Sequence, residues 1–333
     1  MNNLYQYIES GRIVKAYRKH LHLLKEFTEY QHFLTRMSAI DGSKLDKDVF
    51  EVKIKELRSV LSMDPKEVFE LALEEDTHGY LAELAETADD DIYNYLYVCR
   101  VMDDFGILLR NGLHDVISQF EDDLDRILLP DTVNMMCRIS KNEKLRELEG
   151  TICVNGLGYL LPWIDRWDDA HKTKLTESFV ELYRYYLEKV AEFGFKNRNF
   201  VYGLTHCIIN LSNFYTKSVY YADIFNDDIC ELYMPTADLI REQIKTAAEN
   251  NKLKKISSDM LAELLVTYKL LLDKNHTEAR QDYSYVTNLA YQTLVRRIDK
   301  KKNYIRDHKS KTKSEDLRLN EHTNILFILY SRL

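Results

Sequence analysis

The sequence predicts an all-α protein in which antiparallel helical hairpins stack against one another, and three observations favour this fold. The 333-residue chain has only 10 Gly and 4 Pro, too few for the tight reversals of a turn-rich β protein. Apolar residues recur at intervals of three and four along most of the chain, as they do on one face of a helix. No segment shows the strict alternation of a half-buried strand. We therefore expect roughly a dozen helices joined by short loops.

The first clear helix carries an apolar stripe from Phe50 to Leu61 with steps of four, three and four residues. The start of the next helix is marked by capping residues. Asp64 can cap it, Pro65 stands at the first helical position, and Glu67 completes a capping box. The sequence therefore predicts a helix, a short break, and a second helix beginning at residue 65.

Two further helices follow in the first half of the chain. An apolar stripe runs from Ile92 to Phe105, and Asn111-Gly112 is typical of a left-handed stop at the end of such a helix. A single continuous helix is then expected through Val116–Leu128, ending at Pro130.

The second half continues the helical pattern. A long helix begins at an aspartate cap, carries its stripe from Leu175 to Phe193, and is closed by Gly194. The helices expected after it span residues 199–216, one or two segments between Val219 and Asn250, a Ser258-capped segment through Leu272, a segment from about Glu278 to Tyr304, and a last helix that includes Ile325–Leu329.

The last helix is apolar on almost every side between Ile325 and Leu329, and a helix of that kind is usually buried on all faces. Such burial suits a closed ring of helices better than an open rod, so we expect an α/α toroid. We also expect two helical halves, residues 1–130 and 131–333, that form either two domains or one continuous domain.

Composition restricts the classes of partner. Hydrophobic residues make up 45% and charged residues 30% of the chain, which is typical of a folded globular protein. The net charge of −8 argues against nucleic acid and anionic membrane as partners. Five scattered cysteines without a C-x-x-C motif, no signal-peptide pattern and no long apolar run lead us to expect a cytoplasmic protein.

The segment 199–216 carries an unusual second face beside its apolar stripe. Asn199, Tyr202, His206, Asn210 and Asn213 follow one another at steps of three and four residues. A solvated helix face would use Lys and Glu instead. Two interpretations stay open: a buried polar network between helices, or a face that lines a cavity and binds a small polar or sugar-like ligand.

Other polar and aromatic residues could join the same cavity. They are His322 and Asn324 at the start of the last helix, and Trp163, Asp165, Trp167 and Asp168 around Pro162. Here the tryptophans would form a stacking platform, and His206, Asp165 or Asp168 would transfer a proton if the ligand is hydrolysed. We expect no cofactor for this site. The sequence leaves open whether the chain is an enzyme.

A metal-dependent phosphohydrolase is an alternative function. That helical class uses a histidine, then an adjacent His-Asp pair, then a later aspartate, to hold a divalent metal ion that activates water. The chain offers His78, then His114 and Asp115, with Asp165 or Asp168 to complete the set. Residues other than the usual Gly and Lys follow this His-Asp pair, which weakens the match.

The stretches "YGLTHCIINLSNFY" and "NEHTN" together resemble the pattern of an uncharacterised bacterial all-helical family, a domain of unknown function. The resemblance covers the C-terminal two-thirds of the chain. It implies a helical architecture and a bacterial origin, and it implies no activity or catalytic residues. A second alternative function is therefore a non-enzymatic helical scaffold that holds a protein partner.

Overall fold

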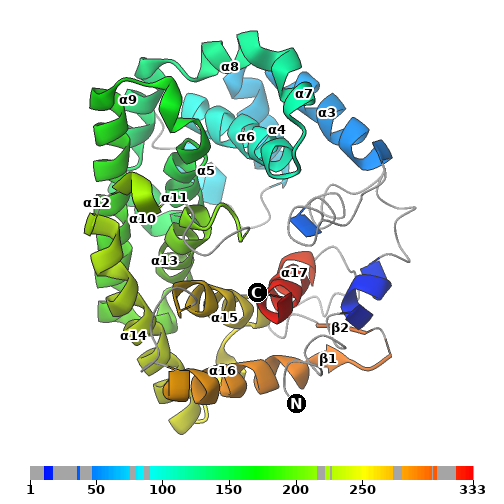
Figure 1. Ribbon diagram of the computed structural model, residues 1–333, viewed down its shortest axis with the longest axis vertical. Coiled ribbons are helices and arrows are strands. Elements are labelled where there is room, and N and C mark those ends of the chain that lie inside the picture. The colour runs from blue at the N-terminus through cyan, green and yellow to red at the C-terminus, as the bar shows by residue number, and fades with distance from the viewer. Residues whose placement is uncertain are drawn as a thin grey trace. The chain divides into compact units, whose positions relative to one another are not determined.

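The computed structural model is almost entirely helical, which confirms the all-α prediction (Figure 1). Contacts divide the chain into two compact units: unit 1 contains residues 1–49, 215–219 and 231–333, and unit 2 contains residues 50–214 and 220–230. Residues 130 and 131 both lie inside unit 2. The boundary between the two observed units therefore differs from the expected boundary between residues 130 and 131. The toroidal arrangement stays a prediction. The structure describes residues 11–17, 36–37, 47–75, 80–85, 91–215, 222–225, 227–272, 280–301, 303–305 and 320–332.

Unit 2 is built from a succession of helices, several of them short. Its α-helices are α3 (Lys47–Leu61), whose first three residues belong to unit 1, α4 (Pro65–Glu75), α5 (Tyr80–Ala85), α6 (Asp91–Arg110), α7 (His114–Ile117), α8 (Glu121–Ile127), α9 (Pro130–Ile139), α10 (Glu143–Leu148), α11 (Gly150–Gly158), α12 (Asp169–Phe193) and α13 (Arg198–Leu211). Its 3-10 turns are η2 (Ser118–Phe120), η3 (Leu161–Arg166), η4 (Gly194–Lys196) and η5 (Ala222–Phe225).

Unit 1 has fewer described elements. They are α14 (Asp227–Glu249), whose first four residues belong to unit 2, η6 (Leu253–Lys255), α15 (Ser258–Leu272), α16 (Arg280–Val295), the two-residue strands β1 (Ile298–Asp299) and β2 (Tyr304–Ile305), and α17 (Glu321–Arg332).

The predicted start of α4 is confirmed in detail. The amide of Lys66 donates to Asp64 Oδ1 at 2.9 Å, and the amide of Asp64 donates to Glu67 Oε2 at 2.9 Å. Both bonds satisfy amides that have no partner inside the helix. Pro65 takes the first helical position, where a missing N–H costs nothing.

The predicted stop after α6 is also confirmed. Gly112 has φ +72°, a conformation that glycine adopts without a steric penalty. The amide of Leu113 then donates to the carbonyl of Leu108 at 3.1 Å, which satisfies one of the last carbonyls of the helix.

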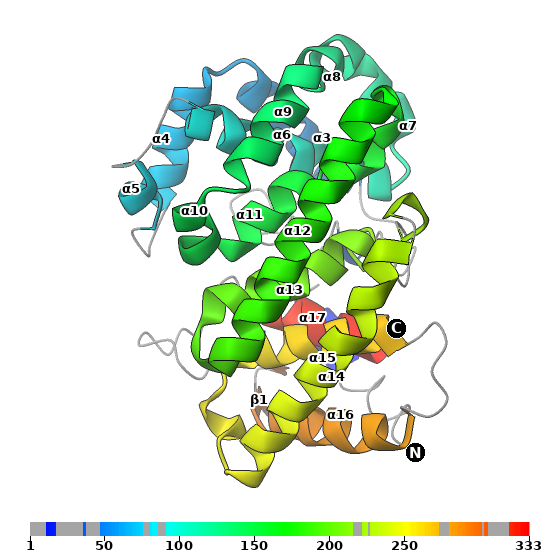
Figure 2. The same cartoon turned by 90° about the vertical axis from the view of Figure 1, so that its left-hand side faces the viewer.

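The long helix α12 and the helix α13 lie side by side in unit 2 (Figure 2). Asp168 caps α12 by accepting from the amide of His171 at 2.9 Å, and Gly194 ends it with φ 61°. The two helices approach closely: a Cβ on Gly203 would lie 2.5 Å from Tyr186 Cδ1. Only glycine therefore fits at position 203 without moving the tyrosine.

The single helix expected over Val116–Leu128 is interrupted. The chain forms α7, then the 3-10 turn η2, then α8. The break occurs at Phe120, which has φ −118° and ψ 23°. This turn lets the Phe120 ring reach the buried Phe105 ring, at a centroid distance of 6.0 Å. Aromatic packing thus overrides the helical pattern.

The helix expected over residues 199–216 ends earlier, at Leu211. Asn213, Phe214 and Tyr215 have positive φ values of 49°, 52° and 72°, so the chain turns in the left-handed region. The amide of Phe214 closes the helix by donating to the carbonyl of Ile209 at 2.9 Å. As a result Asn213 does not continue the polar face of the helix.

In unit 1, α17 packs against α15 (Figure 1). Residues Ile325–Leu329 are all at most 1% exposed, which confirms that this part of the last helix is buried. The helix expected to reach Tyr304 instead ends at Val295, and a small hairpin follows in which Ile298 pairs with Ile305. Asn303, with φ 60°, allows that turn because asparagine tolerates the left-handed region.

Candidate metal centre

The face of α13 that carries His206 is packed against α11. His206 Nδ1 lies 2.9 Å from Asn155 Oδ1, and Asn210 donates to the same oxygen at 2.8 Å. Asn155 in turn donates to the hydroxyl of Tyr159 at 3.2 Å. His206, Asn155 and Asn210 are each at most 8% exposed. The geometry is that of an interhelical hydrogen-bond network.

This network leaves little space for a ligand. A Cβ on Gly158 would overlap the side chain of Asn210, so α11 and α13 are in direct contact there. Asn199 donates to the carbonyls of Glu147 and Leu148, and Tyr202 is 7% exposed. Of the two interpretations of this polar face, the observed contacts match the buried network.

The tryptophans of the segment 163–168 are part of the core. Trp163 is 8% and Trp167 6% exposed, and the indole N–H of Trp167 donates to the carbonyl of Leu128 at 2.7 Å. The Trp163 ring meets Phe105 edge to face, with centroids 6.2 Å apart. Buried rings of this kind stabilise the fold and do not present an open stacking platform.

The two aspartates of the same segment lie at the surface. Asp165 pairs with Lys172 at 3.3 Å. Asp168 caps α12 and also contacts the ring of His171 at 2.7 Å. The backbone hydrogen bond from His171, followed by that from its side chain, holds the pKa of Asp168 below the usual value. A lowered pKa suits a cap and does not suit a general acid at neutral pH.

The structure describes the His-Asp pair of the predicted phosphohydrolase set. His114 and Asp115 lie exposed on the short helix α7, and His78 lies outside the described residues. Within the described part of the chain, neither His114 nor Asp115 belongs to a group of three metal-ligating side chains.

One such group does occur, between α15 and α17 in unit 1. Asp259 and Glu263 are four residues apart and share a face of α15, and α17 places His322 opposite them. His322 Nδ1 lies 2.7 Å from Asp259 Oδ1, and His322 Nε2 lies 4.0 Å from Glu263 Oε2. One ligand atom from each residue lies within 4.8 Å of the other two. Among the residues that the structure describes, this is the only cluster of its kind.

The cluster is enclosed on one side and open on the other. The Glu263 side chain is 0% exposed and that of Asp259 13%, whereas the His322 side chain is 37% exposed. Solvent therefore reaches the cluster beside the imidazole.

The carboxylates control the charge of His322. Burial lowers its pKa, but the adjacent Asp259, through charge and hydrogen bonding, and then Glu263 outweigh that effect and raise the pKa to about 9. Without a metal ion the imidazole is thus a cation at neutral pH.

Three further residues, Thr323, Arg36 and Tyr215, interact with members of the cluster or with the adjacent Glu321. Thr323 donates to Asp259 Oδ1 at 3.1 Å, which orients that carboxylate. Arg36 Nη1 lies 3.5 Å from Glu321 Oε1. Burial, followed by the negative charge of Glu263, raises the pKa of the Tyr215 phenol well above its usual value, so the phenol is neutral and can donate a hydrogen bond.

Sequence reasoning identified His322 but missed Asp259 and Glu263. The signal was present, because these are the only acidic residues in the α15 sequence SDMLAELLVTYKLLL, which is otherwise dominated by apolar residues. Carboxylates are rarely buried unless they are paired or bind a metal ion. The second predicted residue of the last helix, Asn324, has a structural role: it accepts from the amide of Ile305 at 2.8 Å and donates to its carbonyl at 2.9 Å.

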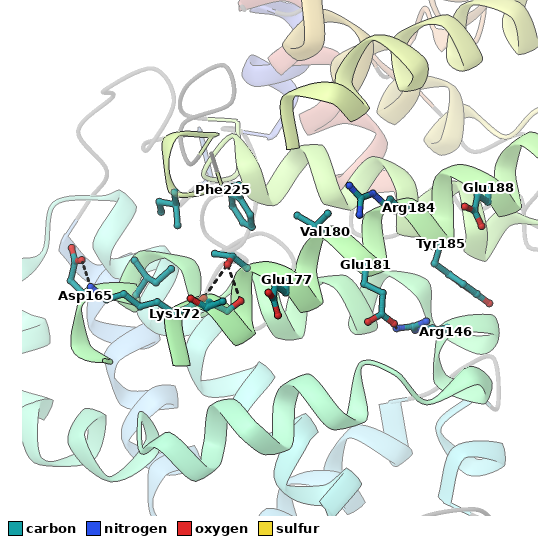
Figure 3. A pocket seen from close by; sticks show the side chains of 14 residues that line it. Arg146, Asp165, Lys172, Glu177, Val180, Glu181, Arg184, Tyr185, Glu188 and Phe225 are labelled. Carbon is teal, nitrogen blue, oxygen red and sulfur yellow. Dashed lines mark hydrogen bonds and ion pairs between the residues drawn. The ribbon is translucent and has the colours of Figure 1, made fainter. Parts of the chain in front are cut away.

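Unit 2 contains a separate pocket of about 930 Å³ along α12 (Figure 3). Asp165 and Lys172 lie at one end, and Glu181 pairs with Arg146 at 3.1 Å nearer the other. Apolar Val180 and Phe225 lie between the charged groups. A polar ligand with an apolar part would fit this lining.

No family model matches the chain, and neither a curated protein nor a solved structure matches it. The resemblance to an uncharacterised bacterial family stays a prediction. No described helix has both the length and the apolar character needed to cross a membrane.

Proposed function

We propose that Asp259, Glu263 and His322 bind a divalent transition-metal ion. The observation that supports this proposal is the convergence of one ligand atom from each residue within 4.8 Å. Ligands of one such ion sit about 2.0–2.2 Å from it, and hence at most about 4.4 Å from each other. Small side-chain movements therefore suffice to bring all three atoms into one coordination sphere.

The donor set indicates both the metal class and its use. One imidazole nitrogen and two carboxylate oxygens suit Zn, Mn, Fe or Co better than the softer metals that thiolates select. Three protein ligands leave at least one position for water or substrate, as in catalytic sites. A bound metal ion would lower the pKa of that water and so favour hydrolysis. We propose a metal-dependent hydrolase.

The chain's own residues have distinct parts in this proposal. In the absence of a metal ion Asp259 accepts from Nδ1 of His322 at 2.7 Å, and a metal ion held by both side chains would replace the proton that they share. Glu263 supplies a buried carboxylate from the side opposite to solvent. Thr323 holds Asp259 in place by its 3.1 Å hydrogen bond.

Metal titration of chelator-treated protein tests the proposal. We expect one Zn²⁺ or Mn²⁺ per chain by calorimetry, and affinity at least tenfold weaker in Glu263→Gln and in His322→Gln. The matched control is His206→Gln, which alters a buried histidine of unit 2 and should leave metal affinity unchanged.

The rival arrangement is a structural ion pair, in which His322 stays a cation between two carboxylates. It predicts no stoichiometric metal binding by the wild type, or equal affinity in Glu263→Gln. Either result contradicts the proposed function. Circular dichroism of each variant shows whether a loss of binding reflects loss of the fold.

A second candidate function is binding of a small polar or sugar-like ligand in the α12 pocket. It is favoured by Glu177, Arg184 and Glu188, which line the pocket and form no ion pair with any described residue. A thermal-shift screen of sugars and nucleotides tests it. A ligand of this pocket should raise the melting temperature of the wild type, and Arg184→Ala should reduce that shift.

A further inference from the structure

We infer that the proposed metal site takes a substrate with a phosphoryl group, and that Arg36 is the side chain that binds its oxygens. This inference rests on the proposed function, because the substrate would be held between the metal ion and the guanidinium. It adds a substrate class and a specificity residue to that site.

The position of Arg36 is the first step. Its Nη1 lies 3.5 Å from Oε1 of Glu321, and Glu321 directly precedes the proposed ligand His322. The guanidinium therefore lies beside the ligand set.

The second step is the difference in side-chain exposure around the cluster. The side chains of His322 and Arg36 are 37% and 28% exposed, whereas those of Glu263 and Glu321 are 0% and 8% exposed. The imidazole and the guanidinium thus form the accessible side of the cluster, and the carboxylates form its interior. A molecule that approaches the cluster from this side would therefore meet Arg36.

Charge then selects the substrate. Asp259, Glu263 and Glu321 are three carboxylates around one site, and without compensation they would repel an anion. A divalent ion and Arg36 supply three positive charges, which balance them. A cationic substrate would instead be repelled by both the metal ion and Arg36 on the accessible side.

The shape of the guanidinium favours a phosphoryl group. Its planar fork donates two parallel hydrogen bonds to phosphate or carboxylate oxygens. The 3.5 Å separation of Arg36 Nη1 from Glu321 Oε1 is longer than a typical N–H···O hydrogen bond. A phosphoryl group has three terminal oxygens, enough to contact the metal ion with one oxygen and the guanidinium with the other two. A carboxylate has only two.

The experiment uses the full chain loaded with Mn²⁺ and inorganic phosphate as the probe, with binding measured by calorimetry and by water-proton relaxation of the bound Mn²⁺. We expect phosphate to bind the loaded wild type, and to bind at least tenfold more weakly to Arg36→Gln. Mn²⁺ affinity should change less than threefold in that variant. Arg36→Lys, which keeps the charge but loses the fork, should show an intermediate loss and serves also if Arg36→Gln does not fold.

Arg126→Gln is the matched control, because it removes an exposed arginine from unit 2 and should leave phosphate affinity unchanged. Equal phosphate affinity in wild type and both Arg36 variants would overturn the inference while leaving metal binding intact. Acetate that binds as tightly as phosphate would overturn the choice of a phosphoryl group. Absence of Mn²⁺ binding in the wild type would overturn the proposed function together with the inference.

Discussion

Two buried or half-buried histidines, His206 in unit 2 and His322 in unit 1, show how the partner decides what a histidine does. Each lies on a helix and approaches an oxygen on another helix, at 2.9 Å for His206 and 2.7 Å for His322. The oxygen near His206 belongs to the amide of Asn155, whereas the oxygen near His322 belongs to the carboxylate of Asp259. An amide completes a neutral network. A carboxylate stabilises the imidazolium, and it is a donor of the kind that divalent metal ions bind.

The two surroundings also differ in access. Around His206 the helices α11 and α13 touch, and a methyl group on Gly158 would overlap Asn210. His322 keeps 37% of its side chain exposed. A histidine can act on an external molecule only where that molecule can reach it, so unit 1 is the better place to look for chemistry.

The largest loss of stability is expected when the hydrogen-bond network of His206 is broken. Asn155→Leu removes the acceptor of both His206 and Asn210 and leaves their buried donors without that partner. Each unsatisfied buried group costs about 1–3 kcal/mol, so we expect the free energy of unfolding to fall by about 2–4 kcal/mol in urea titration. Asn250→Leu, at an exposed helix end, is the control. A loss below about 0.5 kcal/mol in Asn155→Leu would contradict the structural role.

The next effect is a pH dependence of the folding stability that His322 contributes. In metal-free protein its pKa is about 9, above the usual value, so the folded state binds the proton more tightly than the unfolded state. The stabilisation is complete below the unfolded-state pKa of about 6.5 and disappears as pH rises through about 9.

NMR titration of the imidazole measures this pKa directly. We expect Asp259→Asn to lower the midpoint of His322, because the substitution removes the charge that contributes most to raising it. A wild-type midpoint below pH 7 would show that Asp259 does not hold the imidazolium and would remove the contrast with His206.

A smaller effect is expected at the start of α13. Asn197 caps this helix by accepting from the amide of Asn199 at 3.0 Å. Asn197→Ala should lower the unfolding free energy by about 1 kcal/mol, with Lys196→Ala as the control. If the change equalled that of Asn155→Leu, the beginning of the helix would matter as much as the network, and the special role of the network would be lost.

The smallest loss of stability is expected at the exposed Glu181. Its carboxylate forms two ion pairs, with Lys141 at 2.6 Å and with Arg146 at 3.1 Å. Hydrogen bonding from Lys141, and then from Arg146, lowers the pKa of Glu181. Its contribution is therefore present above the unfolded-state pKa and is lost as pH falls through the lower folded-state pKa. Glu181→Gln should change stability by less than about 1 kcal/mol. A larger change would show that an exposed carboxylate contributes as much to stability as the buried His206 network.

Much of the fold could be predicted because its signals are local. The capping box at Asp64 and Glu67, the stop at Gly112 and the buried stretch Ile325–Leu329 depend on residues a few positions apart. The predictions were wrong where a distant contact decided the backbone. The helix expected over Val116–Leu128 breaks at Phe120, where the ring packs on Phe105. The polar face of α13 stops at Leu211, so Asn213 turns away from it.

The sequence by itself determined that this chain is helical, where several helices such as α4 and α12 begin, and which residues are unusual for their position. It could not determine what those residues contact. Asn155 and His206 are 51 residues apart, and Asp259 and His322 are 63 residues apart. Only the packing of α13 on α11 and of α17 on α15 brought an amide to one histidine and a carboxylate to the other. Side-chain chemistry depends on neighbours in space, and helical periodicity specifies only which face of a helix a residue occupies.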